Sequence, residues 1–580
     1  MQKRYNKPDY YGLSILFIVI SIGLLSAVVL VAVFTTAHDT ERHRTYDYVV
    51  VGGGPAGCMI AERLSRDGRH KVILLEAGPD VQDDPILNEI TPATGSIEEQ
   101  FYGKYFWQHA QEAAEVIPNR LSLQLTSGRL FGGGSKINGA QFVRGSNWMF
   151  DSWEFLTGDS IWSVANVLQQ YKELETFYGP DYTSVARGED GPLAIWETMS
   201  SSPQTSPTTM AEKLTTAFEQ ATELPRLDDY NRLTEDVQVG PFLRWQLTAY
   251  PNGTRSSSDV SIMTPEVRGR ENLHILFGAT AVQVLFNNHK SAKGVRYIRE
   301  GKEFVANAAK RVILSAGVNT AQILEHSGIG DAVHLESIGI PVVYDNPNVG
   351  NNMVNQQLIS TIFLKNTEDL PSFNPADIYE GGAFLPDPND EPTEDVSPRR
   401  IQIIGVNAGS VMAVIVINLQ PIETGYTHVR DKDPLRVTAS SDRIFVPTNG
   451  DTDLSTFVKA VQKYICTIHN EFQGMGNGPT VDSNYYLIDP PLSMCYNETL
   501  LTEWVVANAK PHTHHWTSAC KMGKAGDGIS VVNSKGSVWG VHGLTIADNS
   551  ILPRNHDGNT VAPAYLVGKI ISEEIAAGRF

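Results

Sequence analysis

Residues 46–79, YDYVVVGGGPAGCMIAERLSRDGRHKVILLEAGP, contain the feature that most limits what this chain can fold into. Asp47 to Val51 is a short apolar run rich in β-branched residues, and the segment after the glycines has helical periodicity that ends in glycine. The run KVILLE then predicts a second strand, with Glu76 at its end. A glycine motif between a strand and a helix, with a carboxylate beyond it, is typical of a dinucleotide-binding βαβ unit.

Each residue of this motif has a predicted task. Gly52 permits the tight turn, and Gly54 lets backbone N–H groups approach a pyrophosphate at the helix N-terminus. Gly57 lets the helix pack closely on the sheet. Glu76 is expected to accept hydrogen bonds from an adenosine ribose.

Length and charge narrow the class of protein. The chain has 580 residues, 41% of them hydrophobic, which predicts two packed domains around a large core. Its formal net charge is −19 and no basic stripe interrupts the acidic residues, so nucleic acid is not an expected partner. The chain has only 4 cysteines and no paired C-x-x-C spacing, which argues against a disulfide scaffold or a zinc site.

The N-terminal segment predicts membrane attachment. Residues 13–34 contain no charge, and as a helix they would span a hydrocarbon core of about 30 Å. Basic residues precede this segment, which favours a cytoplasmic tail of residues 1–12, a transmembrane signal anchor and a linker of residues 35–45. The catalytic body would then be lumenal or extracellular. The alternative is a cleaved signal peptide and a secreted protein.

Translocation would have two further consequences. It would make Asn252 and Asn497, each in an N-x-T sequon, candidates for glycosylation. It would also allow Cys466 and Cys495 to form a disulfide.

Four further segments carry a resemblance to a known family. Residues 125–153 form a second glycine-rich segment that lacks the Lys-Ser/Thr ending of a phosphate-binding loop. This segment, the run PNGTRSSS, the stretch GVNTAQILEHSGIG (317–330) and the run ADNSILP are similar, in this order, to the glucose-methanol-choline (GMC) family of flavin oxidoreductases. The resemblance extends from about Tyr46 to the C-terminus.

The resemblance implies a mixed fold of the α/β type with α+β elements. A Rossmann-like FAD-binding domain is expected from residues 46–150, 253–353 and 511–580. A substrate domain built on an antiparallel sheet is expected from residues 151–252 and 354–510. The predicted transmembrane helix precedes both domains.

The resemblance also implies which residues hold FAD. The flavin ring is expected against the segment around Gly132 to Gly139, the backbone of Val282 is expected at the adenine, and Asp548 is expected near the ribityl chain. Some relatives attach FAD covalently through a histidine, but that position is Ile137 here, so noncovalent FAD is expected. The expected cofactor-binding residues are Gly52, Gly54, Gly57, Glu76, Gly133, Asn138, Gly139, Val282, Asp548 and Asn559.

The segment PHTHHWTSACKMG (511–523) resembles the family stretch that carries a catalytic histidine five positions before a cysteine. Counting back from Cys520 gives His515, and alignment of the C-terminal segment gives Asn559 as the second active-site residue rather than His556. If the segment is an alternating strand, His514 faces away from His515. His512 and His514 are interpreted as hydrogen-bonding or surface histidines, and no metal site is expected.

These residues predict an FAD-dependent oxidation of an alcohol to an aldehyde or ketone. The flavin accepts a hydride, so a base must remove the hydroxyl proton, and a neutral imidazole with an ordinary pKa of about 6.5 is suited to this. Asn559 would hydrogen-bond the hydroxyl and orient it. The expected partners are a small-molecule alcohol and an electron acceptor, either O2 or another oxidant. The alternatives are a flavin-containing lyase of the same family and a flavin-binding scaffold without turnover.

Four positions depart from the family pattern. Trp516 replaces the usual proline and Ser518 the usual glycine near the predicted base. Asn355 and Gln356 stand where the family often has an acidic residue and a histidine. The wall of the substrate pocket is therefore expected to differ from that of other members.

Overall fold

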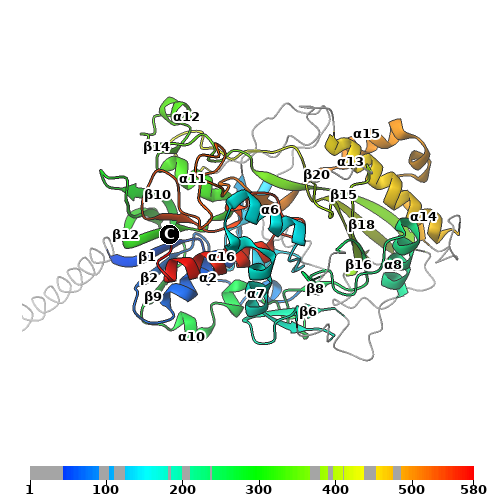
Figure 1. Cartoon of the computed structure of the whole chain (residues 1–580), viewed down its shortest axis with the longest axis horizontal. Coiled ribbons are helices and arrows are strands. Elements are labelled where there is room, and N and C mark those ends of the chain that lie inside the picture. Colours follow the sequence, from blue (N-terminus) through cyan, green and yellow to red (C-terminus); the bar gives the residue numbers. More distant parts are fainter. Residues whose placement is uncertain are drawn as a thin grey trace, which may run out of the picture.

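The computed structural model describes residues 44–90, 104–109, 125–180, 185–198, 209–234, 238–365, 379–389, 396–408, 410–436, 452–474 and 485–580. Two halves follow one another along its long axis, each built on its own large sheet (Figure 1). The predicted anchor, residues 13–34, lies outside the described residues. None of the helices in the described ranges has the length and hydropathy that a bilayer crossing requires.

The first half contains a mixed sheet that begins with the glycine motif. Its parallel part has β1 at the centre, and β10, β11 and β12 extend it as an antiparallel meander. The spatial order is β10 (Thr280–Phe286), β11 (Ala292–Arg299), β12 (Lys302–Leu314), β1 (Thr45–Val51), β2 (Val72–Leu75) and β9 (Leu273–Leu276), with β21 (Leu544–Ile546) also pairing β12.

The predicted turn after β1 is present and leads into α2 (Pro55–Ser65). Gly52 has φ +98°, a conformation that L-residues with side chains rarely adopt. A Cβ on Gly57 would collide with the carbonyl oxygen of Gly52, so only glycine lets the helix start this close to the strand. The C-terminal helix α16 (Val561–Ala576) packs across α2, and a Cβ on Gly568 would lie 2.6 Å from the Cα of Ala56.

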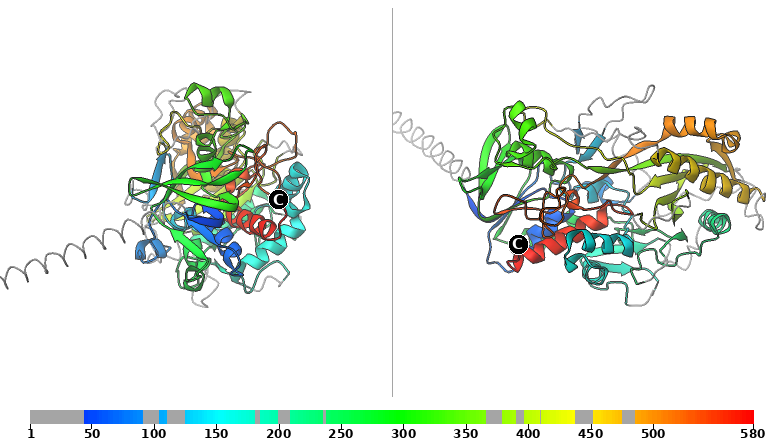
Figure 2. Two further views of the ribbon diagram at one scale, coloured as in Figure 1. Left: turned by 90° about the vertical axis from the view of Figure 1, so that its left-hand side faces the viewer. Right: turned by 45° about the horizontal axis from the view of Figure 1, so that its top comes forward.

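The second half contains a wholly antiparallel sheet, as predicted. Its order is β19 (Tyr485–Asp489), β15 (Val354–Lys365), β18 (Val411–Asn418), β17 (Ile401–Ala408), β16 (Tyr379–Leu385) and β7 (Gly240–Phe242), with β20 (Lys510–Thr517) also pairing β15. Helices α8 (Thr209–Thr222), α13 (Thr452–Ala460), α14 (Thr467–Phe472) and α15 (Glu498–Asn508) lie at this end of the molecule (Figures 1 and 2).

Alternation along these strands gives the sheet two different faces. Ile359, Ile403 and Val414 are buried in a core that also contains residues of α8 and α13. Their neighbours Ile404 and Ile415 project from the opposite face and line the cavity described below. One face therefore anchors the helices and the other faces the candidate site.

Smaller elements complete the fold. Residues of α6 (Asn147–Thr157), α7 (Val164–Leu174) and β6 (Leu193–Glu197) share the hydrophobic core of the first half, although residues 151–252 were predicted as part of the substrate domain. The domain boundaries stay a prediction. Further short elements are β3 (Phe106–His109), β4 (Leu125–Gly128), β5 (Glu175–Tyr178), β8 (Gln246–Leu247), α5 (Gly134–Ile137), α9 (Ser258–Ser261), α11 (Thr320–His326), η3 (Gly317–Asn319), η7 (Leu492–Tyr496) and η8 (Asn549–Ile551).

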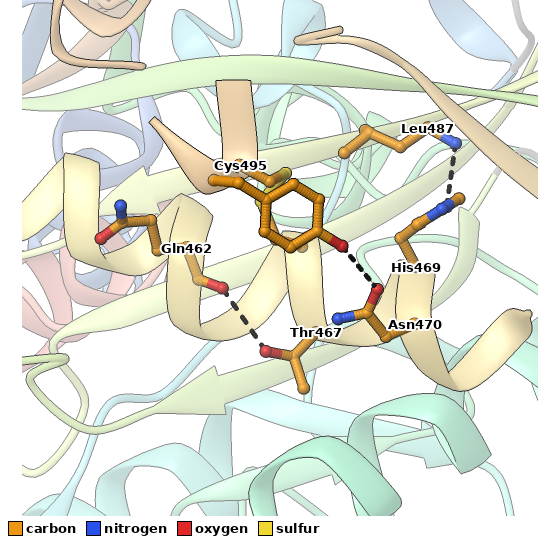
Figure 3. Close-up of a disulfide and its surroundings, with 8 residues drawn as sticks. Gln462, Thr467, His469, Asn470, Leu487 and Cys495 are labelled. Atoms are coloured by element: carbon orange, nitrogen blue, oxygen red, sulfur yellow. Dashed lines mark hydrogen bonds between the residues drawn. A yellow bond between two sulfur atoms is a disulfide. The ribbon is translucent and has the colours of Figure 1, made fainter. Parts of the chain in front are cut away.

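A disulfide joins Cys466 to Cys495, the pairing that translocation would allow. It connects the π-helical turn η6 (Val461–Cys466), which continues into α14, to η7. Near the disulfide, Leu487 N donates a hydrogen bond to His469 Nδ1 (Figure 3). Cys58 and Cys520 are free thiols and both are buried. Asn252 and Asn497, the sequon residues, are exposed.

Candidate active site

A cavity of about 520 Å³ is bounded by elements of both halves. The turn after β1, the α5 segment and β10 line it from the first half, and β16, β17 and β18 line it from the second. Strand β20 contributes three histidines. Of the predicted site residues all but Gly57 line this cavity, namely Gly52, Gly54, Glu76, Gly133, Asn138, Gly139, Val282, His515, Asp548 and Asn559.

Glu76 is tied to the glycine turn. Its two carboxylate oxygens accept hydrogen bonds from the backbone N–H groups of Gly53 and Gly78, each at 2.7 Å. Burial raises the pKa of the Glu76 carboxyl, and these hydrogen bonds oppose that rise. Glu76 thus orders the turn that surrounds it as well as presenting a carboxylate to the cavity.

The second glycine-rich segment lies directly against the first. A Cβ on Gly133 would lie 2.8 Å from the Cα of Gly54, so the two turns approach each other backbone to backbone. Asn138 Oδ1 accepts hydrogen bonds from Ala140 N and from Arg255 Nη1, which fixes the turn that presents Gly139.

Val282 and Asp548 are held in different ways. Val282 is the extra residue of a β-bulge, because the ladder between β10 and β11 passes from Ala281 to Gln283 without pairing it. Asp548 accepts hydrogen bonds from Gly317 N and from Thr320 Oγ1. Burial raises the pKa of Asp548, and the hydrogen bonds oppose this.

His515 is buried, and a single side chain fixes its orientation. Its Nδ1 lies 2.5 Å from Gln356 Oε1. The two amide hydrogens of Gln356 are already donated to the carbonyl oxygens of His556 and Gly558, both at 2.9 Å. The Gln356 oxygen must therefore face His515, so the Nδ1 of His515 carries the proton and Nε2 carries the lone pair.

The surroundings of His515 keep it neutral. Burial lowers its pKa well below 6.5, and His512, His514 and His556 lower it further because their positive charges would repel a protonated His515. A buried neutral imidazole with a defined tautomer can act as a proton acceptor.

His512 accepts a hydrogen bond from His514 N, in agreement with its interpretation as a hydrogen-bonding or surface histidine, but it also makes a contact that was not predicted. Its ring is stacked on that of His515, with 3.5 Å between ring centroids and 8° between ring planes. Simple alternation would place the two on opposite faces, but between Pro511 and Trp516 strand β20 has more residues than β15 has between their partners. His514 also lines the cavity, near the ring of Phe106.

Asn559 is held between two glutamines. It accepts a hydrogen bond from Gln402 Nε2 at 2.8 Å and donates one to Gln141 Oε1 at 2.9 Å. These partners fix the direction of the amide and leave it a second lone pair and a second hydrogen. Gln141 Nε2 has no partner in the described part of the chain and also belongs to the cavity lining.

His556 does not belong to the cavity lining, whereas Asn559 does. It is buried, with Nε2 bonded to Val143 O at 3.0 Å, and burial lowers its pKa to about 4. Its neighbour Asp557 accepts hydrogen bonds from Ser146 and Ser397. These contacts join distant segments beneath the site.

Sequence reasoning missed the roles of Gln141, Gln356 and Gln402 and the stacking of the His512 ring on His515. Gln356 was visible as a departure from the family pattern, but Gln141 and Gln402 gave no local signal. They reach Asn559 from 418 and 157 residues away in the chain. No group of three or more His, Cys, Asp or Glu side chains able to hold a metal ion occurs within the described ranges.

Family models for the N- and C-terminal regions of GMC oxidoreductases match residues 46–358 and 423–568. The chain belongs to the GMC oxidoreductases. Among similar GMC proteins is an oxygen-dependent choline dehydrogenase of Burkholderia ambifaria, 29% identical over 92% of this chain and 94% of the relative. A choline dehydrogenase of Acinetobacter baumannii is 28% identical over 92% and 96%.

Solved structures share the GMC fold. Pyridoxine 4-oxidase from Mesorbium loti superposes with a TM-score of 0.77 at 23% identity, covering 92% of this chain and 99% of the other. A fungal aryl-alcohol oxidase gives a TM-score of 0.74 at 18% identity, covering 92% and 99%. The protein is thus an FAD-dependent oxidoreductase of the GMC family.

The cavity suits this cofactor. Gly54 and Gly133 leave the turn free of side-chain bulk where a pyrophosphate would approach a helix N-terminus. The Glu76 carboxylate stands at the end of β2, where the ribose of a dinucleotide is expected in this fold. Ile137 lines the cavity with an apolar side chain that cannot form a covalent bond to FAD.

Proposed function

We propose that His515 is the general base that accepts the hydroxyl proton of the alcohol. The observation that carries this proposal is the hydrogen bond from His515 Nδ1 to Gln356, because it leaves Nε2 as the basic nitrogen of a buried, cavity-lining imidazole. A positioned general base contributes about 10²- to 10⁴-fold to a rate. When bound, FAD supplies the hydride acceptor.

Asn559 is proposed to orient the same hydroxyl group. Its amide has a hydrogen and a lone pair left after its contacts with Gln402 and Gln141, so it can hydrogen-bond the substrate without competing for the proton. His515 and Asn559 together would restrict the hydroxyl to one orientation, which lowers the entropic part of the barrier. The cofactor is proposed to be held noncovalently, since residue 137 is isoleucine.

The test is anaerobic flavin reduction in a His515→Ala variant. Wild-type enzyme and variant are mixed with a panel of short, aromatic and long-chain alcohols, and bleaching of the oxidised flavin bands is followed by stopped flow. We expect a rate loss of about 10²-fold or more in the variant. Reduction by dithionite, which needs no base, serves as the control and should be equal in both.

Two outcomes would overturn the proposal. An unchanged rate in the variant would exclude His515 as the base. Wild-type flavin that stays oxidised with every alcohol, yet reacts with dithionite, would instead favour the lyase chemistry found elsewhere in the family.

The membrane anchor is proposed on the uncharged run of residues 13–34 and the basic residues before it. Expression of the full chain followed by carbonate extraction tests it. Retention in the membrane pellet is expected, and release of a shortened protein into the medium would indicate a cleaved signal peptide.

A further inference from the structure

The antiparallel sheet walls part of the cavity that His515 and Asn559 also line, and its strands β15 and β17 hold these two residues through Gln356 and Gln402. Ile404 of β17 and Ile415 of β18 are paired across the ladder and both line the cavity. Tyr379 of β16, the ladder partner of Val406, also lines the cavity, and its hydroxyl donates a hydrogen bond to Gly139 O at 2.9 Å. Two branched aliphatic side chains and the ring of a tyrosine with its hydroxyl engaged therefore form an apolar wall.

This apolar wall continues beyond the cavity. Ile415 and Ile404 are followed on the same face by Val406 and Ala413, which are paired with each other, and then by Val411. These three side chains are partly buried. An aliphatic or aromatic group that entered along this wall would contact apolar side chains first outside the cavity, at Val411, and then inside it, at Ile404 and Ile415.

The acidic groups of the cavity lie in the part that is formed by the first half of the molecule. Among the described residues that line it, the only acidic side chains are Glu76 and Asp548, and none is lysine or arginine. Both carboxylates are occupied by hydrogen bonds from the first half of the molecule, Glu76 by Gly53 and Gly78 and Asp548 by Gly317. Among the described lining residues, none would offer a cation or an anion a counter-charge beside Ile404 and Ile415.

We propose that the alcohol substrate is neutral and largely apolar, with its carbon skeleton against Tyr379, Ile404 and Ile415 and its hydroxyl between His515 and Asn559. This rests on the proposed function, because it takes the hydroxyl to lie at His515. It sets the chain apart from the choline dehydrogenases to which it is similar, whose named substrate carries a permanent positive charge. A buried charge without a partner is strongly disfavoured, whereas each methylene placed on an apolar surface improves binding by about fourfold.

The sharpest test compares two alcohols of nearly the same shape. Choline and 3,3-dimethylbutan-1-ol differ mainly in the central atom of the bulky group, a positively charged nitrogen in the first and a neutral carbon in the second. Anaerobic flavin reduction by each is measured with the full-chain holoenzyme. We expect the ratio of the reduction rate to the dissociation constant to be at least about 100-fold higher for the neutral alcohol.

A second series varies the apolar part alone. Linear primary alcohols from ethanol to octanol are expected to bind more tightly with each added methylene until the wall is covered. In the His515→Ala holoenzyme, where oxidation is suppressed, the affinities of the neutral alcohol and of choline are measured by calorimetry. The preference for the neutral alcohol should persist there, since it comes from the wall and not from the base.

Charge introduced on the wall tests its location. Ile415→Glu should weaken binding of the neutral alcohol and raise the affinity for choline relative to it. Ile415→Gln, which has the same size but no charge, should not favour choline. Val411→Glu places a carboxylate on the same face of β18 outside the cavity lining and should leave the choice between the two alcohols unchanged. Retained flavin absorbance reports that each variant is folded.

The outcomes of these experiments distinguish a failure of the substrate assignment from a failure of the proposed function. If alcohols reduce the flavin but choline is preferred or equal, the substrate assignment is wrong and the role of His515 is untouched. If no alcohol reduces the flavin, the proposed function is wrong and this assignment falls with it. If Ile415→Glu fails to bind FAD, the comparison of the two alcohols in the wild-type enzyme still decides.

Discussion

The imidazole rings of His512 and His515 are parallel within 8°, with their centroids 3.5 Å apart. Burial is the largest cause of the lowered pKa of His515, and the nearby His512 is the next. The proposed base should therefore stay unprotonated in mildly acidic solution. We expect the acid limb of the pH profile for flavin reduction to lie below pH 6.5, the approximate ordinary histidine value.

His512→Phe tests the contribution of the stacked ring. Phenylalanine keeps an aromatic ring against His515 but cannot carry charge, so the acid limb should move to higher pH. His514→Phe is the matched control, because His514 lowers the same pKa by a smaller amount. A wild-type acid limb at or above 6.5, measured by stopped flow, would contradict the explanation.

Gln356 should control both the tautomer and the basicity of His515. Gln356→Leu removes the acceptor for Nδ1–H, and we expect flavin reduction to slow by at least about 10-fold at every pH. Gln356→Glu keeps an acceptor but adds a negative charge that favours the protonated imidazole, so the acid limb should move to higher pH. Equal profiles for the wild type and the glutamate variant would mean that Gln356 does not set the properties of the base.

Stability should fall on acidification because several histidines are buried in the neutral form. Burial lowers the pKa of His109 to about 3 and that of His556 to about 4. Below about pH 6.5 the unfolded chain binds protons at these sites and the folded chain does not, so the free energy of unfolding drops by roughly 1.4 kcal/mol per pH unit for each histidine. The window for His556 extends from about pH 6.5 to about 4.

Scanning calorimetry of the holoenzyme between pH 7.5 and 4.5 measures this dependence. His556→Gln keeps a donor for Val143 O but does not titrate, and it should show a smaller fall in unfolding temperature. Identical pH dependence in the two proteins would exclude His556 from the effect.

Ser518 should cost stability through its backbone. It has φ +70°, in the left-handed region, where the family usually has glycine. Both Ser518→Gly and Ser518→Ala lose the side-chain hydrogen bond to Thr517, so their difference isolates the backbone. The glycine variant should be more stable than the alanine variant by about 1 kcal/mol, measured by thermal unfolding. The reverse order would show that the left-handed conformation carries no penalty here.

The disulfide should stabilise the half that contains it. Its cysteines are 29 residues apart, and closing a loop of that size contributes about 3.6 kcal/mol in the chain-entropy description. A Cys466→Ala, Cys495→Ala double variant should unfold at a lower temperature, and reductant should lower the unfolding temperature of the wild type only. Because Cys58 and Cys520 are buried free thiols, they provide no second reducible bond.

The glycine turn was predictable because its determinants are local. A strand, three glycines and a carboxylate within one βαβ unit require the same turn wherever they occur, and Gly52 and Glu76 adopt it. His515, Asn559 and Asp548 could be predicted as site residues only through resemblance to the family. The residues next to them in the sequence carry no signal of function, and the same is true of His556, which does not line the cavity.

The rest depends on contacts that no local pattern encodes. Gln402 reaches Asn559 across the cavity from a strand of the other half, and one glutamine among many gives no sign of this. The stacking of His512 on His515 was not predicted, because alternation holds only where a ladder is regular, and β20 carries extra residues where the histidines lie. The anchor stays a prediction, because residues 13–34 lie outside the described ranges.

Strand β20 leaves α15, pairs with β15 of the antiparallel sheet, and runs on into the FAD-binding half. Its His515 is held by Gln356, a residue of that same β15. Strand β15 also pairs with β18, which carries Ile415 of the apolar wall. The base and the wall therefore belong to neighbouring strands of one sheet. An engineer who grafts the wall of another GMC enzyme onto this chain would have to preserve the pairing of β18 with β15, because a shift of β15 would move Gln356 and misalign the base.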